Sequence, residues 1–370
     1  MNQGQKGLEE KVLRKNMCTA CGACLGLCPY LKSREGKIIK LDDCDLSNGR
    51  CYAYCPRSRV DWEGLQKKIF DQDYKDINLG TVREVRMARA KEPIWKGKVQ
   101  TGGVVSALID FALREGIIHS AVLTQREKDL LPSGRIVSER DQILSCSGSG
   151  YISGPTLEAL NQGSWQGEER IGVVGLPCQI LALAKMKESD LPNKTPVERV
   201  VLTIGLFCTW ALGYKPFKMF LEDRFGLQSI QKLDITPPPE RLLKVWVGDQ
   251  IEEIPLDEIR DFIRPACQVC PDMTSEFADL SVGTVEGVPD WNTVIVRTER
   301  GKDLLSAAVK KGIIETQDLP EENRRHLQEA SRLKKQRALT ALKNLGEPEE
   351  EGYLNLSADL KEKILEEKTA

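Results

Sequence analysis

The sequence has very few histidines and no long apolar run. Its 370 residues include only two histidines, His119 and His326, which disfavours a histidine-based zinc or hydrolytic site. The most apolar stretches, residues 171–184 and 200–213, are 14 residues each, short of the roughly 20 that cross a bilayer. The net charge is −2, so no strong field is directed at nucleic acid. We therefore expect neither membrane insertion nor nucleic-acid binding.

The N-terminus also lacks the apolar stretch of a secretory signal, since residues 1–15 are polar and charged. This absence predicts a cytoplasmic protein. Cysteine is the abundant exception: there are twelve, and seven lie between residues 16 and 58. In a reducing compartment, clustered cysteines more often bind metal or perform redox chemistry than form disulfides.

The first cysteine array has the spacing C-x2-C-x2-C-x3-C followed by Pro29, and its members are Cys18, Cys21, Cys24 and Cys28. This spacing is typical of bacterial ferredoxins, in which the fourth cysteine serves the other of two clusters. A structural zinc site, the alternative, usually shows two separated C-x2-C pairs. The array therefore predicts at least one 4Fe-4S cluster.

A second half-motif consists of Cys44, Cys51 and Cys55, and Pro56 follows it. By analogy with the first array, Cys55 completes cluster 1 with Cys18, Cys21 and Cys24. Cluster 2 then has three thiols and is one ligand short: Cys28, Cys44 and Cys51. A carboxylate of Asp42, Asp43 or Asp45 could fill the vacancy, a three-iron cluster could form, or the site could be empty; we favour a second cluster.

The chain divides by composition into four segments. Residues 1–60 have little apolar periodicity and read as a ferredoxin-like 4Fe-4S domain that something other than burial must hold together. Residues 61–80 read as a linker with a connector helix. Alternating elements from residue 81 to 319 predict an α/β (α+β) core: helices at 104–113, 179–187 and 215–224, and strands at 117–124, 171–174, 200–207 and 242–247. Residues 320–370 predict a charged, solvated helical tail, with a docking helix as the alternative.

Five cysteines fall within the core. Cys178 and Cys208 directly follow predicted strands, where ligands of open α/β sheets bind, and Cys267 and Cys270 form a local C-x2-C pair. These four could hold a further cluster, while Cys146 stands alone. From spacing alone, the alternative that they are small core residues is equally supported.

Several motifs in order resemble the beta subunits of coenzyme F420 hydrogenases and dehydrogenases. The resemblance covers residues 16–303 and rests on these segments: 101–108 (TGGVVSAL), 148–151 (GSGY), 175–179 (GLPCQ), 205–208 (GLFC), the Cys267–Cys270 pair, 278–283 (ADLSVG) and 294–298 (VIVRT). It implies a flavoprotein that carries FAD and at least one iron–sulfur cluster, with an N-terminal ferredoxin module in longer members. It also favours cluster 3, held by Cys178, Cys208, Cys267 and Cys270.

The resemblance directs attention to a phosphate-binding loop. Thr101, Gly102 and Gly103 precede an apolar helix that begins near Val104, and a helix N-terminus offers free N–H groups to a pyrophosphate. A second small-residue loop could wrap the FAD, and Lys98 could offset phosphate charge, although a solvated lysine is the alternative. The second loop contains Ser147, Gly148, Ser149 and Tyr151.

Together these features predict an iron–sulfur flavoprotein oxidoreductase, one subunit of a complex. Its FAD and two or three 4Fe-4S clusters would pass electrons between a hydride carrier, reduced coenzyme F420 or NAD(P)H, and a ferredoxin or partner redox subunit. No catalytic acid or base is required, because the cofactor performs the chemistry. The alternative is a non-catalytic relay and docking subunit with clusters but no flavin.

Overall fold

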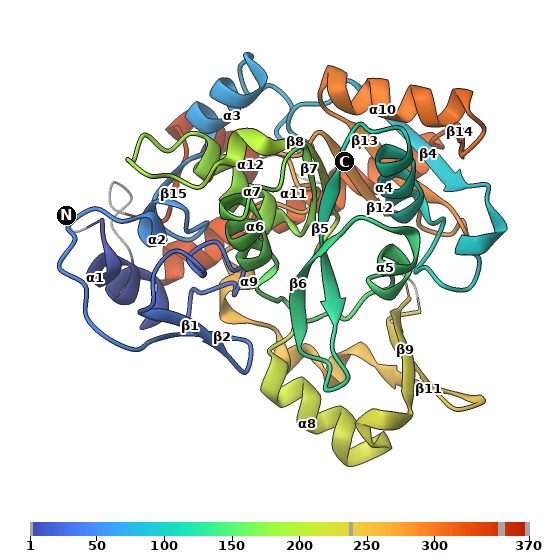
Figure 1. Ribbon diagram of the computed structural model, residues 1–370, viewed down its shortest axis with the longest axis horizontal. Helices are drawn as coiled ribbons and strands as arrows, with labels where there is room; N and C mark the ends of the chain where they lie inside the picture. Colours follow the sequence, from blue (N-terminus) through green and yellow to red (C-terminus); the bar gives the residue numbers. More distant parts are fainter. Residues whose placement is uncertain (1–2, 237–239, 347–351, 367–370) are drawn as a thin grey trace.

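The computed structural model describes residues 3–236, 240–346 and 352–366. At its centre is a mixed eight-stranded sheet (Figure 1). The strands β12, β8, β7 and β5 are parallel neighbours, and antiparallel strands extend the sheet on both sides. In sheet order the strands are β14 (Ile314–Asp318), β4 (Glu84–Ala90), β13 (Asn292–Val296), β12 (Leu280–Thr284), β8 (Val200–Leu206), β7 (Ile171–Gly175), β5 (Ser120–Arg126) and β6 (Pro132–Val137).

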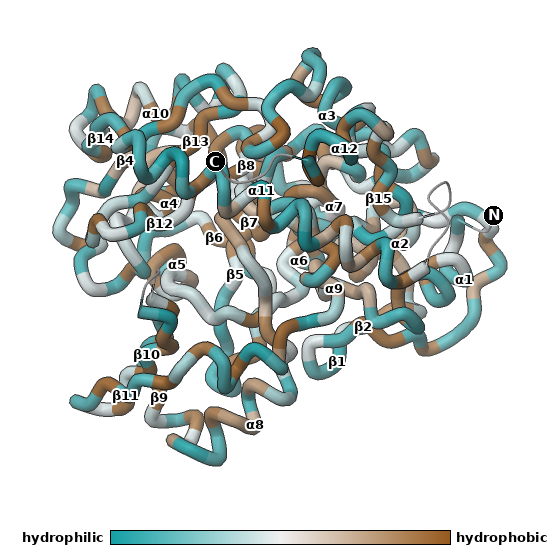
Figure 2. The backbone as a smooth tube through the Cα atoms, turned by 180° about the vertical axis from the view of Figure 1, so that it is seen from behind, coloured by the Kyte–Doolittle hydropathy of each residue, from teal (hydrophilic) through white to brown (hydrophobic). Residues whose placement is uncertain are grey.

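Helices cover both faces of this sheet. α4 (Val104–Arg114) and α10 (Glu299–Lys310) pack on one face, and α6 (Thr156–Trp165) and α7 (Pro177–Lys187) on the other. Successive strand residues point to opposite faces: Val122 and Val173 join the α6–α7 core, whereas Leu123 and Val174 join the α4–α10 core. This layering confirms the predicted α/β class, and hydrophobic residues concentrate along the buried strands and α7 (Figure 2).

A smaller lobe projects from the core below α5 in Figure 1. It comprises α8 (Tyr214–Phe225) and the antiparallel strands β9 (Ile230–Ile235), β10 (Leu242–Val247) and β11 (Gln250–Pro255). Phe217, Leu233 and Leu243 are in its own buried cluster. The sequence predicted the helix and the strand at 242–247 but not that they form a separate lobe.

The N-terminal region packs directly on the core. Leu8, Leu25 and Trp62 share one hydrophobic cluster with Leu181 of α7 and Leu354 near the C-terminus. The expectation that burial does not hold this region together was therefore wrong, because its apolar partners come from distant parts of the chain. Its elements are α1 (Gln5–Leu8), a π-helical turn (Glu9–Leu13), β1 (Leu31–Arg34), β2 (Lys37–Lys40), α2 (Arg50–Ala53), β3 (Val60–Asp61) and α3 (Trp62–Phe70).

The C-terminal segment is helical as predicted but is not a solvated tail. α11 (Glu321–Asn344) buries Lys334, Lys335 and Ala338 against the core. β15 (Leu354–Asn355) pairs in parallel with β3, and α12 (Ala358–Glu366) follows. Residues 347–351 and 367–370 of the predicted tail lie outside the described residues. The pattern of charged residues alone does not reveal that one face of α11 packs against the core of the same chain.

Shorter elements complete the chain. They are the 3-10 turns Pro93–Trp95, Val197–Arg199, Leu227–Ser229, Leu256–Glu258 and Arg260–Phe262, and the helices α5 (Arg140–Ser145) and α9 (Pro265–Gln268). Among the described residues, no helix is both long and apolar enough to cross a membrane.

Candidate redox site

The N-terminal thiols lie in two adjacent groups. Burial, followed by the thiols of Cys18, Cys21 and Cys55, raises the pKa of Cys24. Burial, with the thiols of Cys28 and Cys44 nearby, raises the pKa of Cys51 to about 12. Because charges affect a pKa this way only at short range, the structure brings together the two sets that spacing grouped. Group 1 is Cys18, Cys21, Cys24 and Cys55, and group 2 is Cys28, Cys44 and Cys51.

Group 2 is the more exposed. Cys28 is exposed and Cys44 half-buried, whereas three members of group 1 are buried. Two of the carboxylates considered for the vacant position have other partners: Asp43 pairs with Lys40 at 2.7 Å, and Asp42 accepts the backbone N–H of Asp43 at 2.8 Å. The fourth ligand of group 2 stays a prediction.

Group 3 forms at the ends of two parallel strands. Cys178 stands in the first turn of α7, directly after β7, and Cys208 follows β8. Burial, with the thiols of Cys270 and Cys267 nearby, raises the pKa of Cys178 to about 12. Burial also raises the pKa of Cys208, and Cys267, Cys178 and Cys270 contribute. Cys146, at the end of α5, lies apart from these thiols, and burial raises its pKa.

The three groups follow one another through the molecule. Besides burial and its own group, the Cys51 thiol raises the pKa of Cys24, which links group 1 to group 2. Besides burial, the Cys178 thiol raises the pKa of Cys21, which links group 1 to group 3. The order is therefore group 2 near the surface, group 1 in the middle and group 3 at the edge of the sheet.

None of these sets converges as the ligands of a single ion do. Among the described residues, no group of three or more His, Cys, Asp or Glu side chains is close enough to hold one metal ion. A zinc ion draws its thiolates to about 2.3 Å from one centre. In a cubane cluster each thiolate binds a different iron, so the thiols stand farther apart. The clusters of groups 1 and 3 stay a prediction.

Buried cations accompany the thiols, and the sequence did not single them out. Lys185 of α7 donates from Nζ to the carbonyl of Cys55 at 2.8 Å. Burial lowers the pKa of Lys185 to about 8. Arg57 and Lys334 stand beside group 3, and although burial favours the neutral thiol, they hold the pKa of Cys270 below its usual value. Arg57 directly follows the Cys55-Pro56 pair, so its position was visible in the sequence; Lys334 carried no such signal.

The cysteine loop is anchored to the core at α6. The backbone N–H of Leu157 donates to the carbonyl of Cys21 at 3.0 Å. Asn161 donates from Nδ2 to the carbonyls of Ala23 and Leu25, at 3.1 and 2.6 Å. These bonds fix group 1 against the helix that covers β5 and β6.

The two predicted cofactor loops also meet. Ser147 donates from Oγ to the carbonyl of Lys98 at 2.7 Å, and the N–H of Ser149 donates to Oε1 of Gln100 at 3.1 Å. Tyr151 accepts the N–H of Ile235 at 2.7 Å. Burial, with the Asp234 carboxylate as the next cause, raises the pKa of Tyr151. Gln100, which sequence reasoning missed, therefore joins the loops, and Asp234 closes the network.

Gly102, the first glycine of the pair, packs closely against β13. A Cβ at Gly102 would lie 2.7 Å from Oδ1 and 3.0 Å from the backbone nitrogen of Asn292. Gly102 thus permits close approach to β13. The N–H of Val104 already donates to Oδ1 of Asn292 at 3.3 Å, and Nδ2 of Asn292 donates to Oγ1 of Thr101 at 2.7 Å. Asn292 therefore satisfies the first amide of α4, the position predicted for a pyrophosphate.

Two glycines near these loops face open space. Gly97 and Gly148 have φ values of +76° and +90°, and no atom lies within 4 Å of a Cβ built at either. Trp95, packed against the same loop, buries an indole N–H that has no partner among the described residues. Lys98 is exposed at the rim. The binding of FAD across these two loops stays a prediction.

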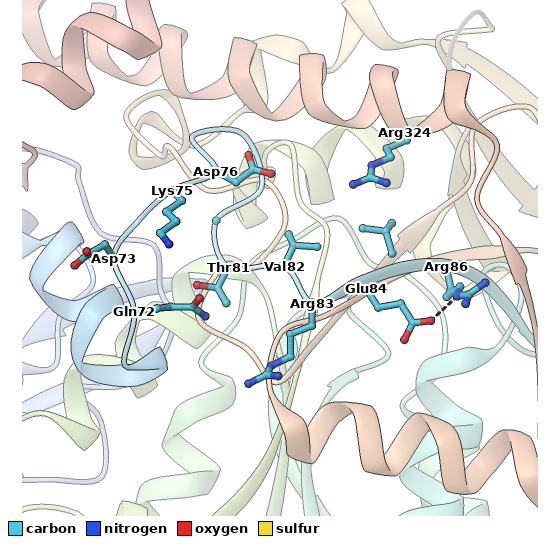
Figure 3. Close-up of a pocket in the computed structure, with 12 residues that line it drawn as sticks. Gln72, Asp73, Lys75, Asp76, Thr81, Val82, Arg83, Glu84, Arg86 and Arg324 are labelled. Atoms are coloured by element: carbon cyan, nitrogen blue, oxygen red, sulfur yellow. Dashed lines mark hydrogen bonds and ion pairs between the residues drawn. The ribbon is translucent and has the colours of Figure 1, made fainter.

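A surface pocket of about 500 Å³ lies elsewhere (Figure 3). It is lined mainly by residues 72–86 and contains none of the predicted site residues. Arg86 on its rim pairs with Glu84 and Asp318, and Arg83 pairs with Glu299. Its arginines are thus largely occupied by neighbouring carboxylates, and we assign it no role.

The fold and the site define an α/β protein with one group of thiols at the ends of two parallel strands. A cysteine-rich N-terminal region with two further thiol groups packs next to it. Residues 85–161 match the model for the N-terminal part of the coenzyme F420 hydrogenase/dehydrogenase beta subunit, and residues 168–322 match that for its C terminus. The chain belongs to this family, as its motifs predicted. Residues before 85 and after 322 lie outside both matches.

Individual relatives agree. The coenzyme F420 hydrogenase subunit beta of Methanothermobacter thermautotrophicus is 30% identical over 249 residues, 66% of this chain and 87% of that protein. A subunit of the F(420)H(2) dehydrogenase of Methanosarcina mazei is 30% identical over 307 residues, 79% of this chain and 82% of that protein. A chain of the xenon-derivatised F420-reducing [NiFe] hydrogenase complex from Methanosarcina barkeri matches with a TM-score of 0.68 and 28% identity, covering 73% of this chain and 94% of that chain.

Proposed function

We propose that this chain is the electron-transfer subunit of a cytoplasmic oxidoreductase complex linked to coenzyme F420 or NAD(P)H. Groups 1, 2 and 3 hold 4Fe-4S clusters, and the loops at 98–104 and 147–151 hold FAD. The hydride carrier is reduced coenzyme F420 or NAD(P)H, and the partner is a ferredoxin or another redox subunit. When bound, a flavin exchanges hydride for single electrons, which iron–sulfur clusters can carry.

The observation that supports this proposal most directly is the unbroken series of thiol groups from the surface to the sheet edge. Cys21 and Cys178 are close enough for one thiol to affect the other, although they belong to the N-terminal region and the core respectively. Group 2 lies at the exposed end, where Leu41 and Leu46 are 59% and 63% exposed. Apolar side chains beside an exposed cysteine group suit a partner protein at this end of the series.

The chain's own residues position the groups and exclude water. Ser147, Gln100 and Tyr151 hold the two loops together, so a cofactor bound there meets a preformed surface. Burial of Cys21, Cys24 and Cys55 shields most of group 1 from solvent, and Cys270 is the buried member of group 3. No residue in the proposal moves a proton.

A second candidate is a relay subunit that binds clusters without flavin. It is favoured by one observation: Asn292 already occupies the first amide of α4. Anaerobic purification with quantified iron, sulfide and flavin separates the two. About one FAD with eight to twelve irons supports the oxidoreductase, whereas clusters without flavin support the relay.

The hydride donor is tested by adding reduced coenzyme F420, NADH and NADPH anaerobically and following loss of flavin absorbance. The thiol groups are tested by Cys21→Ser, which should lower iron per chain. Cys146→Ser is the matched control and should leave the iron content unchanged, because Cys146 lies outside all three groups. Equal iron in both variants would contradict the assignment of group 1.

A further inference from the structure

Two buried cations flank group 3, and both lie outside the residues that the two family models match. Arg57 belongs to the N-terminal region and Lys334 to α11, and they are 2% and 4% exposed. We infer that Lys334 and Arg57 are positioning residues that supply the counter-charge to a cluster in group 3 and raise its reduction potential. The inference rests on the proposed function, since it requires a cluster in group 3.

Lys334 is fixed beside the thiols by the packing of α11. Its Nζ donates to the backbone carbonyl of Cys208, a member of group 3. Neighbours on the same helix hold the position: Ser331 donates to the carbonyl of Asn78 at 2.6 Å, and Arg337 donates to the carbonyl of Thr209 at 3.3 Å. The packing of α11 therefore fixes the ammonium group of Lys334 next to group 3.

Arg57 approaches group 3 from the opposite end of the chain. Its Nε and Nη2 donate to the carbonyl of Ala266, the residue before Cys267, at 3.3 and 3.1 Å. Nη1 donates to the hydroxyl of Tyr353 at 2.8 Å, and the guanidinium lies 4.9 Å from the centre of that ring. The N–H of Val60 donates to the Tyr353 carbonyl at 2.8 Å, so the C-terminal segment also holds Arg57 in place.

These cations lack the partner that buried charges normally have. Where the structure describes the chain, no carboxylate stands within ion-pair distance of Arg57 or Lys334; by contrast, the next residue, Lys335, pairs with Glu276. Asp272, which follows the Cys267–Cys270 pair in the sequence, uses its carboxylate to accept the N–H of Glu276. Burying an unpaired charge is costly, so an anionic group is required. Four thiolates around a cluster supply that negative charge.

The expected consequence is electrostatic. Reduction adds negative charge to a buried cluster, and a nearby cation stabilises the reduced form more than the oxidised form. The two cations would therefore favour reduction of a cluster in group 3. A neutral side chain at position 334 would lower the potential without removing a ligand.

The test compares three variants of α11 in anaerobically purified full-length protein, by redox titration followed by electron paramagnetic resonance. Lys334→Met should shift the midpoint of one cluster signal to lower potential, and Lys334→Arg should keep that midpoint near the wild-type value. Lys343→Met, at an exposed position of the same helix, is the matched control and should leave every midpoint unchanged. Unchanged midpoints in Lys334→Met, with full iron content, would overturn the inference.

A second neutral variant covers the case in which Lys334→Met does not fold. If Lys334→Met yields no iron-loaded protein, Lys334→Gln is measured, which keeps a donor for the Cys208 carbonyl but has no charge. Iron loss in both neutral variants with retention in Lys334→Arg supports the charge requirement. Iron loss in Lys334→Arg as well points to packing and overturns the inference. If the wild-type protein holds no cluster in group 3, the proposed function fails instead.

Discussion

Replacing Gly22 with alanine should loosen the contact between the cysteine loop and α6. Gly22 has a φ of +88°, and a Cβ built there would lie 2.6 Å from both the carbonyl carbon and oxygen of Pro155. It would also lie 2.8 Å from the backbone nitrogen of Glu158. Because these are backbone atoms, no side-chain rotation relieves the overlap, and the loop that carries Cys21 and Cys24 must move.

The magnitude follows from two costs. A left-handed conformation costs a residue other than glycine roughly 1–2 kcal/mol. Forcing extra volume into a packed contact costs about 1–3 kcal/mol. We therefore expect Gly22→Ala to lower the free energy of unfolding by roughly 2–5 kcal/mol. Gly116 has a φ of +66° but no atom within 4 Å of its Cβ position, so Gly116→Ala should incur only the first cost.

The assay is urea unfolding of anaerobically purified protein followed by circular dichroism, with iron per chain measured on the same samples. Gly22→Ala should unfold at lower urea than Gly116→Ala and should hold less iron, because group 1 is displaced. Equal unfolding midpoints and equal iron in the two variants would refute the argument that the loop rests on α6.

Three further predictions concern the core and its lobe. Tyr214→Phe removes a 2.7 Å hydrogen bond to Asp129 and should cost about 1.5–3 kcal/mol at pH 7. Burial alone would raise the pKa of Asp129, but this hydrogen bond holds it below the usual 3.8. The stability difference between the wild type and Tyr214→Phe should therefore be present above pH 3.8 and shrink at lower pH, where the carboxylate is protonated. Urea unfolding of both proteins at pH 7 and pH 3 checks this. Asp110→Ala removes the buried carboxylate that accepts from Arg140 at 2.8 Å, while Glu92 still pairs with Arg140 at 3.0 Å, so it should cost about 1.5–3 kcal/mol in the same assay; a loss below about 1 kcal/mol would contradict it. Tyr151→Phe removes the acceptor of the Ile235 amide and should lower flavin per chain, so a full flavin complement would count against the loop assignment.

Local patterns in the sequence predicted the elements of the core well. The helix at α4 and the strands at β7 and β8 follow from apolar periodicity and β-branched runs, because both signals depend only on near neighbours. The ferredoxin spacing likewise keeps Cys18, Cys21 and Cys24 together, since loops of two residues fix short distances, whereas only the fold brings Cys55 to them. Family membership followed from motifs spread along the chain.

Contacts between distant residues required the tertiary structure. The approach of Cys21 to Cys178, the pairing of β15 with β3 and the delivery of Lys334 to group 3 join residues from distant parts of the chain. The main core elements, the family and the number and spacing of the thiols follow from the sequence alone, because local patterns and short motifs carry them. The tertiary structure shows that α11 buries lysines and that the N-terminal region shares a hydrophobic cluster with α7. Burial depends on which distant segment packs against a residue, and local sequence does not contain that information.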